Sequence, residues 1–365
     1  MKIGIITFHA AHNYGSMLQA YALQTYLERQ GHKVEIINFR TPKQKSIYAK
    51  PLSWEDMPHI KQSIKRLLLD PYSIKDLNKK WHLFETFLTN FLNLTKEYNT
   101  VEELKDASFD YDYIVTGSDQ IWNTKAMDFS EAYFATFAKT KKIAYAPSMG
   151  PEPESQDASY VKSLLKDYLA VSVREKRTKS FLENNDIYKP VELVLDPTML
   201  LDAEDYKSLF VKDPLIKGKY IFYYTPGGIR PEFMRIAQEI GKKYKLPIIT
   251  DGTYYPKEMN EFSDIQQYKA VGPSEFLNLV KNAEIVCGAS FHLMVFAILF
   301  KKQFYCINGD IDSRMNNLMN IMGMEDKIVS VHNKKQISSL VSRCKSSLFL
   351  EMKQKSSTFL NFSNE

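Results

Sequence analysis

A strand that runs straight into a buried helix, over residues 283–300, constrains the fold most strongly. The apolar run up to Cys287 is typical of a buried strand, and Gly288 interrupts it. Ser290 can cap the apolar helix that follows, and His292 stands at the junction. In open α/β sheets, ligands bind at the carboxyl ends of strands beside helix N-termini. His292 is therefore a candidate functional residue, unless the segment only caps a buried helix.

The same alternation of strand and helix recurs along the chain. Strands are expected over residues 2–7, 34–38, 112–116, 142–146, 170–173, 192–195, 219–224, 246–250, 283–287 and 303–307. Helices are expected between most of them, which predicts parallel sheets. A chain of 365 residues is too long for one ordinary core. We therefore expect an α/β protein with two Rossmann-like domains that face each other across a cleft, a GT-B-like architecture.

Breaks in this alternation set the expected domain boundaries. The N-terminal domain is expected over residues 1–201, with a proline-containing helical insertion at about 40–99 that packs on or covers the first sheet. The C-terminal domain is expected over residues 202–352. A polar tail over residues 353–365 should fray, because it is rich in serine and lysine.

Charge and cysteine usage exclude several classes of protein. The formal charge of +5, from 48 basic and 43 acidic residues, is too weak to indicate nucleic-acid binding, but it is compatible with an anionic substrate or a loose membrane-surface contact. The 3 cysteines form no Cys-x-x-Cys pair, so neither a disulfide framework nor a zinc site is indicated. No apolar run approaches ~20 residues. We expect a soluble cytoplasmic protein.

The loop after the first expected strand contains His9 and His12. This His-x-x-His spacing has no nearby Asp or Glu partners, so it is weak evidence for a metal, and none is expected. Gly15 alone precedes the next helix, so an ordinary dinucleotide site is not expected there.

Eight short polar and aromatic segments follow one another in a fixed order along the chain. They are Asn13-Tyr-Gly-Ser-x-Leu-Gln-Ala-Tyr-Ala-Leu23, Gly117-Ser-Asp-Gln-Ile-Trp-Asn123, Tyr145-Ala-Pro-Ser148, Ser172-Val-Arg-Glu175, Leu195-Asp-Pro-Thr198, Gly272-Pro-Ser-Glu-Phe276, Ser290-Phe-His292, and Arg314 followed by Asn-Asn-Leu and Met322-Gly-Met324. Each segment is weak evidence alone, and their order makes them specific. In this order they resemble the polysaccharide pyruvyl transferase family.

The resemblance implies a GT-B-like fold and transfer of a pyruvyl group from phosphoenolpyruvate to a sugar of a cell-surface polysaccharide or its precursor, forming a pyruvate ketal. The catalytic histidine would be His292, and the donor-binding arginine would be Arg174, which we also expect to act in catalysis. The reaction needs one acid–base group near neutral pKa, which suits a histidine. The donor is an anion that arginine forks and helix N-termini can hold, so Ser290 and Arg314 are further donor-binding candidates.

The resemblance places the acceptor in the first domain and the donor in the second. Amide, carboxylate and aromatic side chains that suit a sugar ring lie in two loops of the first domain; the candidates are Asn13, Tyr14, Gln19, Asp119, Gln120, Trp122 and Asn123. The expected partners are a glycan or lipid-linked glycan and phosphoenolpyruvate as co-substrate, with no cofactor and no nucleic acid. A peripheral position at the inner membrane surface is compatible with such an acceptor.

Two residues depart from the family pattern, which usually reads Thr-Asp-Ser-Phe-His-Gly around the histidine. Here Ala289 replaces the Asp and Leu293 replaces the Gly. Losing an acidic neighbour removes one influence that raises a histidine pKa. Leucine in place of glycine restricts the approach of the backbone to a ligand.

Two other functions are compatible with the residues. One is a GT-B-type glycosyltransferase with a nucleotide-sugar donor, because Asp251 ends a strand where a ribose-binding acid often lies. The other is an inactive family member that binds glycan, favoured by the altered residues beside His292.

Overall fold

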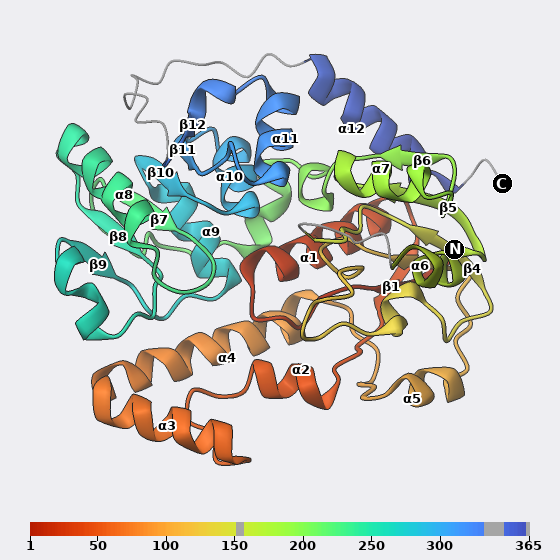
Figure 1. The fold of residues 1–365 in the computed structure, drawn as a ribbon, viewed down its shortest axis with the longest axis horizontal. Coiled ribbons are helices and arrows are strands. Elements are labelled where there is room, and N and C mark those ends of the chain that lie inside the picture. Colours follow the sequence, from red (N-terminus) through yellow and green to blue (C-terminus); the bar gives the residue numbers. More distant parts are fainter. Residues whose placement is uncertain (151–156, 332–346, 363–365) are drawn as a thin grey trace. The chain divides into compact units, whose positions relative to one another are not determined.

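The computed structural model describes residues 1–150, 157–331 and 347–362, and the chain divides into two compact units. Unit 1 comprises Met1–Tyr48, Leu88–Leu201 and Ser347–Glu365, and unit 2 comprises Ala49–Phe87 and Asp202–Ser346. Each unit is built on one six-stranded parallel sheet (Figure 1). Two parallel sheets, one in each unit, confirm the expected fold class, which is α/β with two Rossmann-like domains of GT-B-like type.

The sheet of unit 1 has the order β2-β1-β3-β4-β5-β6. Its strands are β1 (Lys2–Ile6), β2 (Lys33–Ile36), β3 (Tyr113–Thr116), β4 (Lys141–Ala144), β5 (Tyr168–Val173) and β6 (Val191–Leu193). Its helices are α1 (Tyr14–Arg29), α2 (Pro42–Ile47), α5 (Val101–Asp106), α6 (Ala158–Leu165), α7 (Lys176–Asn184) and α12 (Ser347–Phe359). The interior strands β1 and β3 are almost wholly buried, as expected where helices cover both faces of a parallel sheet, whereas the edge strand β2 has exposed and partly exposed positions.

The sheet of unit 2 has the order β12-β11-β10-β7-β8-β9. Its strands are β7 (Ile221–Tyr224), β8 (Ile248–Thr250), β9 (Ile265–Gln267), β10 (Ile285–Gly288), β11 (Gln303–Ile307) and β12 (Ile328–Val329). Its helices are α3 (Met57–Leu69), most of α4 (Ile74–Phe91), α8 (Pro231–Tyr244), α9 (Pro273–Asn282), α10 (Phe291–Leu299) and α11 (Ser313–Met322). Short 3-10 helices occur in both units. Those of unit 1 are η2 (Glu131–Phe134) and η4 (Pro197–Met199), and those of unit 2 are η1 (Pro71–Ser73), η5 (Ala203–Leu209), η6 (Pro256–Phe262) and η7 (Glu325–Lys327).

The helical insertion expected at about 40–99 is divided between the two units, so the expectation that it packs on the first sheet fails for its central part, whereas residues 40–48 and 88–99 belong to unit 1. Most of it, residues 49–87, belongs to unit 2. Polar contacts explain this: the Lys80 ammonium lies 3.1 Å from the Asp251 carboxylate, and the Lys269 ammonium lies 3.3 Å from that of Asp70. The Arg66 guanidinium also stacks 4.2 Å from the ring centre of Tyr255.

The expectation of a frayed tail from residue 353 is also wrong over the described residues. Helix α12 continues to Phe359, and Leu360 is fully buried. The backbone N–H of Leu195 donates to Ser356 Oγ at 2.9 Å, and the Tyr26 hydroxyl donates to Ser357 Oγ at 2.8 Å. These contacts tie α12 to unit 1, so residues 347–352 belong there rather than to the C-terminal domain. The sequence also predicts a last helix from about residue 334, and that predicted start lies outside the described residues.

Candidate functional site

Each sheet has one point where the strand order reverses, and such points are where open α/β sheets bind ligands. In unit 2 the reversal lies between β7 and β10, and in unit 1 it lies between β1 and β3. Ser290 and His292 follow β10 directly. Most acceptor candidates lie in the loops after β1 and β3, and Tyr14 and Gln19 lie in the first two turns of α1, the helix that follows the first of these loops. The structure therefore brings the sequence-predicted residues to the carboxyl edge of their own sheets.

Gly288 makes the turn after β10 sterically feasible. Its φ is +152°, and a Cβ added there would lie 1.9 Å from the carbonyl oxygen of Tyr224. Only glycine tolerates both conditions. The next residue, Ala289, donates its N–H to Tyr224 O and to Thr225 Oγ1, each at 3.3 Å. The loop after β10 is thus held against the end of β7.

Ser290 caps helix α10, because its Oγ accepts from the N–H of Leu293 at 3.4 Å. His292 is the second residue of that helix and is 9% exposed. Its ring lies edge-to-face against Phe291, with centroids 5.1 Å apart. The positive end of a helix favours an anion nearby, and an imidazole can give or accept a proton. An anionic ligand at the N-terminus of α10 would therefore lie close to the His292 imidazole, which can act as an acid or a base.

Ala289 and Leu293, the two residues that depart from the family pattern, both have apolar surroundings. Leu293 is fully buried, so its side chain belongs to the core of unit 2. Ala289 packs on the apolar cluster beneath it. Neither residue brings a charge to His292.

Arg314 is engaged by its neighbour Asp312 at the start of α11. Its Nε and Nη2 donate to Asp312 Oδ1 and Oδ2 at 3.2 and 2.7 Å. Asp312 also caps the helix by accepting from the N–H groups of Arg314 and Met315. Burial raises the pKa of Asp312, but the hydrogen bond and charge of Arg314 outweigh this and lower it. Donor binding by the Arg314 fork would require this pair to open.

Arg174, which follows β5, lies inside unit 1 with a side chain only 2% exposed. Its Nη1, Nη2 and Nε lie 2.7, 3.3 and 3.3 Å from the carboxylates of Asp196, Asp119 and Glu175. Burial lowers the pKa of Arg174, and these carboxylates more than offset it, so the pKa is raised. The guanidinium is enclosed by internal ion pairs rather than presented to a phosphate.

Three acceptor candidates hold the loops at the edge of the first sheet together. Asn13 caps α1 by accepting from Gly15 N at 2.9 Å and Ser16 N at 3.3 Å. Gln19 Nε2 donates to Thr7 Oγ1 at 2.9 Å, and Gln19 Oε1 accepts from Ser118 N at 3.1 Å.

Asp119, in the loop after β3, bonds to Arg174 through one carboxylate oxygen and accepts from the Ser16 hydroxyl through the other. Its side chain is 12% exposed. Together with Asn13 and Gln19 it links the loops after β1 and β3 to the Arg174 cluster, which gives all three a structural role.

The other acceptor candidates differ in exposure. Trp122 is fully buried, with its ring stacked 4.9 Å from that of Phe134, and its Nε1 donates to Tyr133 O at 3.3 Å. The expectation that its face meets a sugar ring is therefore wrong for this structure. Tyr14 is buried too, whereas Gln120 and Asn123 are partly exposed beside each other.

A group of residues that sequence reasoning missed lies near Asp119. Burial raises the pKa of Asp128, and the charge of Asp119 raises it further, while a hydrogen bond from Gln44 works against the shift. Burial also raises the pKa of Tyr48, with the charges of Asp128 and Asp119 contributing. Tyr48 stacks on His12 with centroids 5.5 Å apart. A carboxylate with a raised pKa can accept a proton from a hydroxyl.

No motif marks Asp128 or Tyr48 in the sequence, so spacing could not have found them. His12 stood out only as half of a His-x-x-His pair. Among the described residues, no group of three or more His, Cys, Asp and Glu side chains is placed to hold a metal ion.

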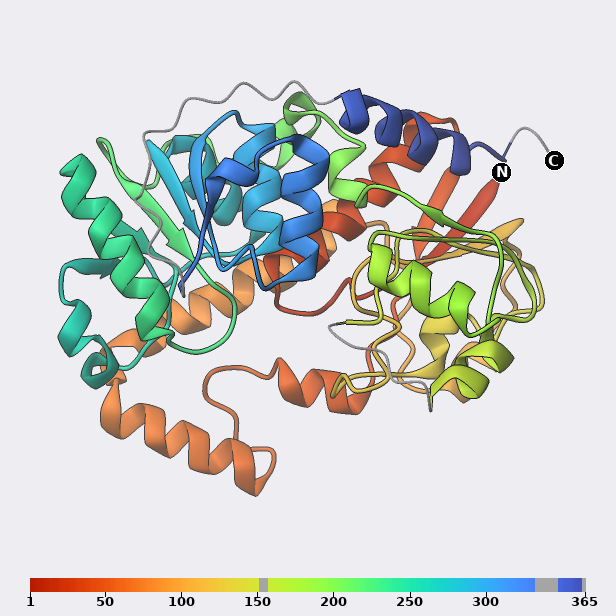
Figure 2. The same cartoon turned by 45° about the horizontal axis from the view of Figure 1, so that its top comes forward.

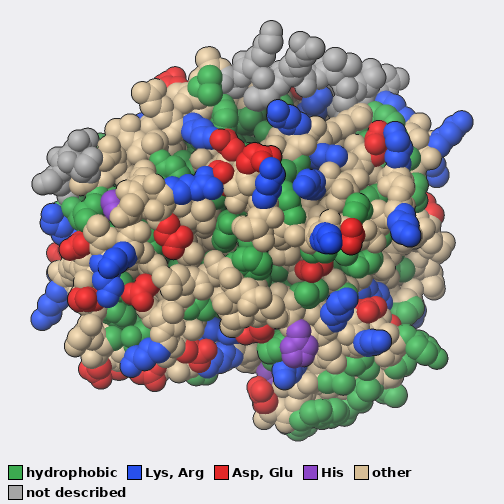
Figure 3. All heavy atoms as spheres, turned by 180° about the vertical axis from the view of Figure 1, so that it is seen from behind, with side chains coloured by type: hydrophobic (Ala, Val, Ile, Leu, Met, Phe, Trp, Pro, Cys, Tyr) green, Lys and Arg blue, Asp and Glu red, His purple; other side chains and the backbone are tan. Residues whose placement is uncertain are grey.

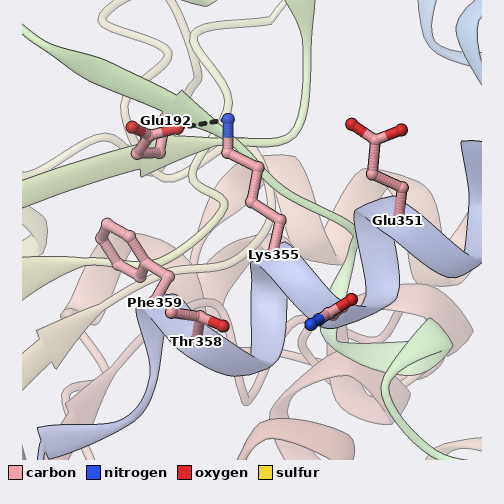
Figure 4. A pocket seen from close by; sticks show the side chains of 6 residues that line it. Glu192, Glu351, Lys355, Thr358 and Phe359 are labelled. Atoms are coloured by element: carbon pink, nitrogen blue, oxygen red, sulfur yellow. Dashed lines mark ion pairs between the residues drawn. The ribbon is translucent and has the colours of Figure 1, made fainter.

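A cavity of about 440 Å³ lies elsewhere in unit 1, beside α12 (Figure 4). It is lined by Glu192, Glu351, Gln354, Lys355, Thr358 and Phe359. The Lys355 ammonium points at Glu192 and forms an ion pair with it (Figure 4). Two glutamates and one paired lysine do not suit an anionic donor, and none of the predicted site residues lies there.

Comparison with known proteins bears on these sites. The family model of the polysaccharide pyruvyl transferases matches residues 13–311, most of the chain. The chain belongs to the polysaccharide pyruvyl transferase family. Membership of this family supports a transferase that modifies polysaccharide. The search of curated proteins returned no match.

Solved structures support the fold. The chain is similar to a protein from Listeria monocytogenes assigned as UDP-N-acetylglucosamine 2-epimerase, with 10% identity, 88% of this chain and 86% of that chain covered, and a TM-score of 0.52. Weaker likenesses include UDP-N-acetylglucosamine 2-epimerase from Rickettsia bellii (9% identity, 99% and 95% covered, TM-score 0.49) and E. coli heptosyltransferase WaaC with ADP-2-deoxy-2-fluoro heptose (14%, 86% and 90%, TM-score 0.41). At these identities the likeness concerns the fold alone.

In the part of the chain that the structure describes, no helix combines the length and apolarity needed to cross a membrane.

Proposed function

We propose that this family member transfers a pyruvyl group from phosphoenolpyruvate to two hydroxyls of one sugar in a cell-surface polysaccharide or its precursor, forming a cyclic ketal. The observation that carries the proposal is the position of His292. In a chain of this family, it lies at the strand reversal of unit 2, on the N-terminus of α10.

The first step protonates the donor methylene, and His292 is the proposed acid. The central carbon then carries oxocarbenium character, and a sugar hydroxyl attacks it. The positive end of α10 favours the carboxylate and phosphate of the donor near His292. In this proposal Ser290 acts by fixing the start of that helix.

The second step breaks the bond between the central carbon and the phosphate oxygen, and a second hydroxyl closes the ketal. The two sugar hydroxyls lose one proton each. One of these protons replaces the proton that was given to the methylene, and the other leaves with the phosphate. Asp128 is the proposed base for an acceptor hydroxyl, because burial and the charge of Asp119 raise its pKa and so make the carboxylate a better proton acceptor. Asp119 supports it by charge rather than by touching the sugar.

Arg174 enters this proposal as a positioning residue. Its ion pairs orient Asp119, which in turn raises the pKa of Asp128. The expected role in donor binding passes to Arg314, whose side chain is 30% exposed and which would exchange Asp312 for phosphate.

Incubation with phosphoenolpyruvate and a panel of hexosides tests the proposal. We expect phosphate release together with a new ketal methyl signal in the proton NMR spectrum. His292→Gln should lose product formation by at least about 100-fold, since general acid–base catalysis contributes that much. His82→Gln, an exposed histidine of the same unit, is the matched control and should keep full activity. A His292→Gln enzyme as active as the native one would refute the role of His292.

The glycosyltransferase alternative receives less support. Asp251 does follow β8, but it is 5% exposed and its carboxylate lies 3.1 Å from the Lys80 ammonium. A ribose would have to displace this pair. In a thermal-shift assay, stabilisation by nucleotide-sugars and not by phosphoenolpyruvate would favour that alternative. Binding of glycan without any turnover would favour an inactive family member.

A further inference from the structure

Helix α3 has its apolar side turned toward solvent. Met57, Ile64 and Leu68 are 61%, 46% and 76% exposed. Their spacing of seven and four residues places them on one face of an α-helix. An amphipathic helix on a globular protein normally buries this face, so α3 is inverted.

The polar side of α3 faces the protein instead. Ser63 is buried, and its hydroxyl accepts from Ser53 N at 2.9 Å and donates to Ser53 O at 2.8 Å. Arg66 pairs with Asp70 at 3.2 Å and stacks on the ring of Tyr255. These contacts hold the polar side of α3 against the rest of unit 2. The apolar stripe is exposed because it lies on the opposite side of the helix.

Further exposed apolar side chains extend the stripe into a patch. We define the α3 face as Trp54, Met57, Ile64, Leu67, Leu68, Leu69 and Tyr72, all of which are exposed. Hydrophobic side chains gather over this helix in the space-filling view (Figure 3), and α3, drawn in orange, lies at an edge of unit 2 (Figure 2). Contiguous apolar patches of this kind mark interaction sites, whereas single exposed residues do not.

The chemistry of the α3 face fits a lipid surface. Trp54 and Tyr72 stand at its two ends, 56% and 95% exposed, and these residue types favour the headgroup region of bilayers. Lys61 and Lys65 are exposed on the same helix beside the stripe, and the Lys65 ammonium also lies 5.0 Å from the ring centre of Tyr255. Lysines next to leucine and aromatic side chains on one helix are typical of segments that lie in the plane of an anionic membrane.

We propose that the α3 face docks the protein on the surface of a bilayer containing anionic lipid. The apolar stripe enters the boundary between headgroups and acyl chains, and Lys61 and Lys65 meet lipid phosphates. The proposal does not depend on the reaction, because none of its residues belongs to the proposed catalytic set. A second copy of the chain seated on the same face is the rival occupant.

Vesicle sedimentation tests the proposal. The native protein should bind vesicles of phosphatidylcholine mixed with phosphatidylglycerol more strongly than vesicles of phosphatidylcholine alone, and added salt should weaken this binding. Ile64→Ser/Leu68→Ser should reduce partition at least about tenfold. Lys61→Glu/Lys65→Glu should remove the preference for phosphatidylglycerol. Leu350→Ser, at a 67% exposed position on α12, is the matched control and should bind as the native protein does.

Three results would overturn the proposal. The first is a native protein that binds neither vesicle type at low salt, and the second is an Ile64→Ser/Leu68→Ser variant that binds as the control does. In analytical ultracentrifugation, a native dimer that becomes a monomer in the double variant would assign the α3 face to a second copy. Equal thermal midpoints of variant and native protein establish that folding is intact, and the single variant Leu68→Gln repeats the comparison with a smaller change.

Discussion

At the scale of single residues, Arg174 is the most tightly engaged charged group among the sequence-predicted site residues. Each of its three guanidinium nitrogens meets a different carboxylate, and the side chain is almost fully buried. A planar fork can satisfy three partners at once, whereas a lysine ammonium on a flexible stem cannot match that geometry.

Replacing Arg174 should therefore cost stability. Arg174→Met leaves three carboxylates around an apolar side chain, and we expect the free energy of unfolding to fall by about 3–5 kcal/mol. The free energy of unfolding of Arg174→Lys should lie between those of Arg174→Met and the native protein. Urea denaturation measures both variants. Lys176→Met, at the exposed first residue of α7, is the control and should change the free energy of unfolding by less than about 0.5 kcal/mol. Unchanged stability with a raised KM for phosphoenolpyruvate would instead mean that Arg174 contacts the donor.

The sequence identified Arg174, Asp119 and Trp122 but not what each would touch. Short motifs locate polar residues at strand ends, because that depends on local periodicity. Which carboxylates enclose the arginine depends on loops separated by 55 and 22 positions in the chain. The burial of Trp122 depends likewise on its packing against Phe134, which no local pattern specifies.

At the scale of elements, the sequence predicted most strands because a buried parallel strand is an apolar run. It missed β9 and β12: β9 is Ile-Gln-Gln and lacks the apolar run that marks the equally short β8, and β12 contains two residues. It also found α3 and α4 but assigned them to the wrong sheet. Their periodicity defines helices, whereas their location depends on distant pairs such as Lys80 with Asp251.

The turn between β10 and α10 gives a test at this scale. Gly288→Ala places a methyl group against the Tyr224 carbonyl at a positive φ, so we expect a loss of at least about 2 kcal/mol of unfolding free energy. Activity should fall as well, because the turn sets the position of His292. Gly228→Ala is the control, since its added Cβ meets nothing within 4 Å. Equal denaturation curves for the two variants would show that the turn adapts without strain.

At the scale of the whole molecule, unit 1 is assembled from three separate segments of the chain and unit 2 from two. Length and composition predicted two domains. They could not predict that the chain returns to unit 1 after completing unit 2, because that depends on single contacts such as Leu195 N–H with Ser356 Oγ.

Removing α12 should weaken unit 1 selectively. A chain ending at residue 346 leaves the Leu195 N–H without Ser356 and removes the buried Leu360. We expect amide hydrogen exchange in β1 to β6 to accelerate about 100-fold or more, with little change in β7 to β11. Hydrogen-exchange mass spectrometry measures both sets of peptides. The full chain with Thr358→Ala, an exposed position on α12, serves as control, and equal acceleration in both units would contradict the expectation.

The return of the chain to unit 1 has a consequence for biosynthesis. A ribosome makes β1 of unit 1 before any strand of unit 2, and it makes α12 after every strand of unit 2 that the structure describes. All the described residues of unit 2 are synthesised before α12, so its sheet can close while unit 1 still lacks its last helix. The side chains of unit 1 that α12 covers therefore stay exposed until the described residues of unit 2 have been made.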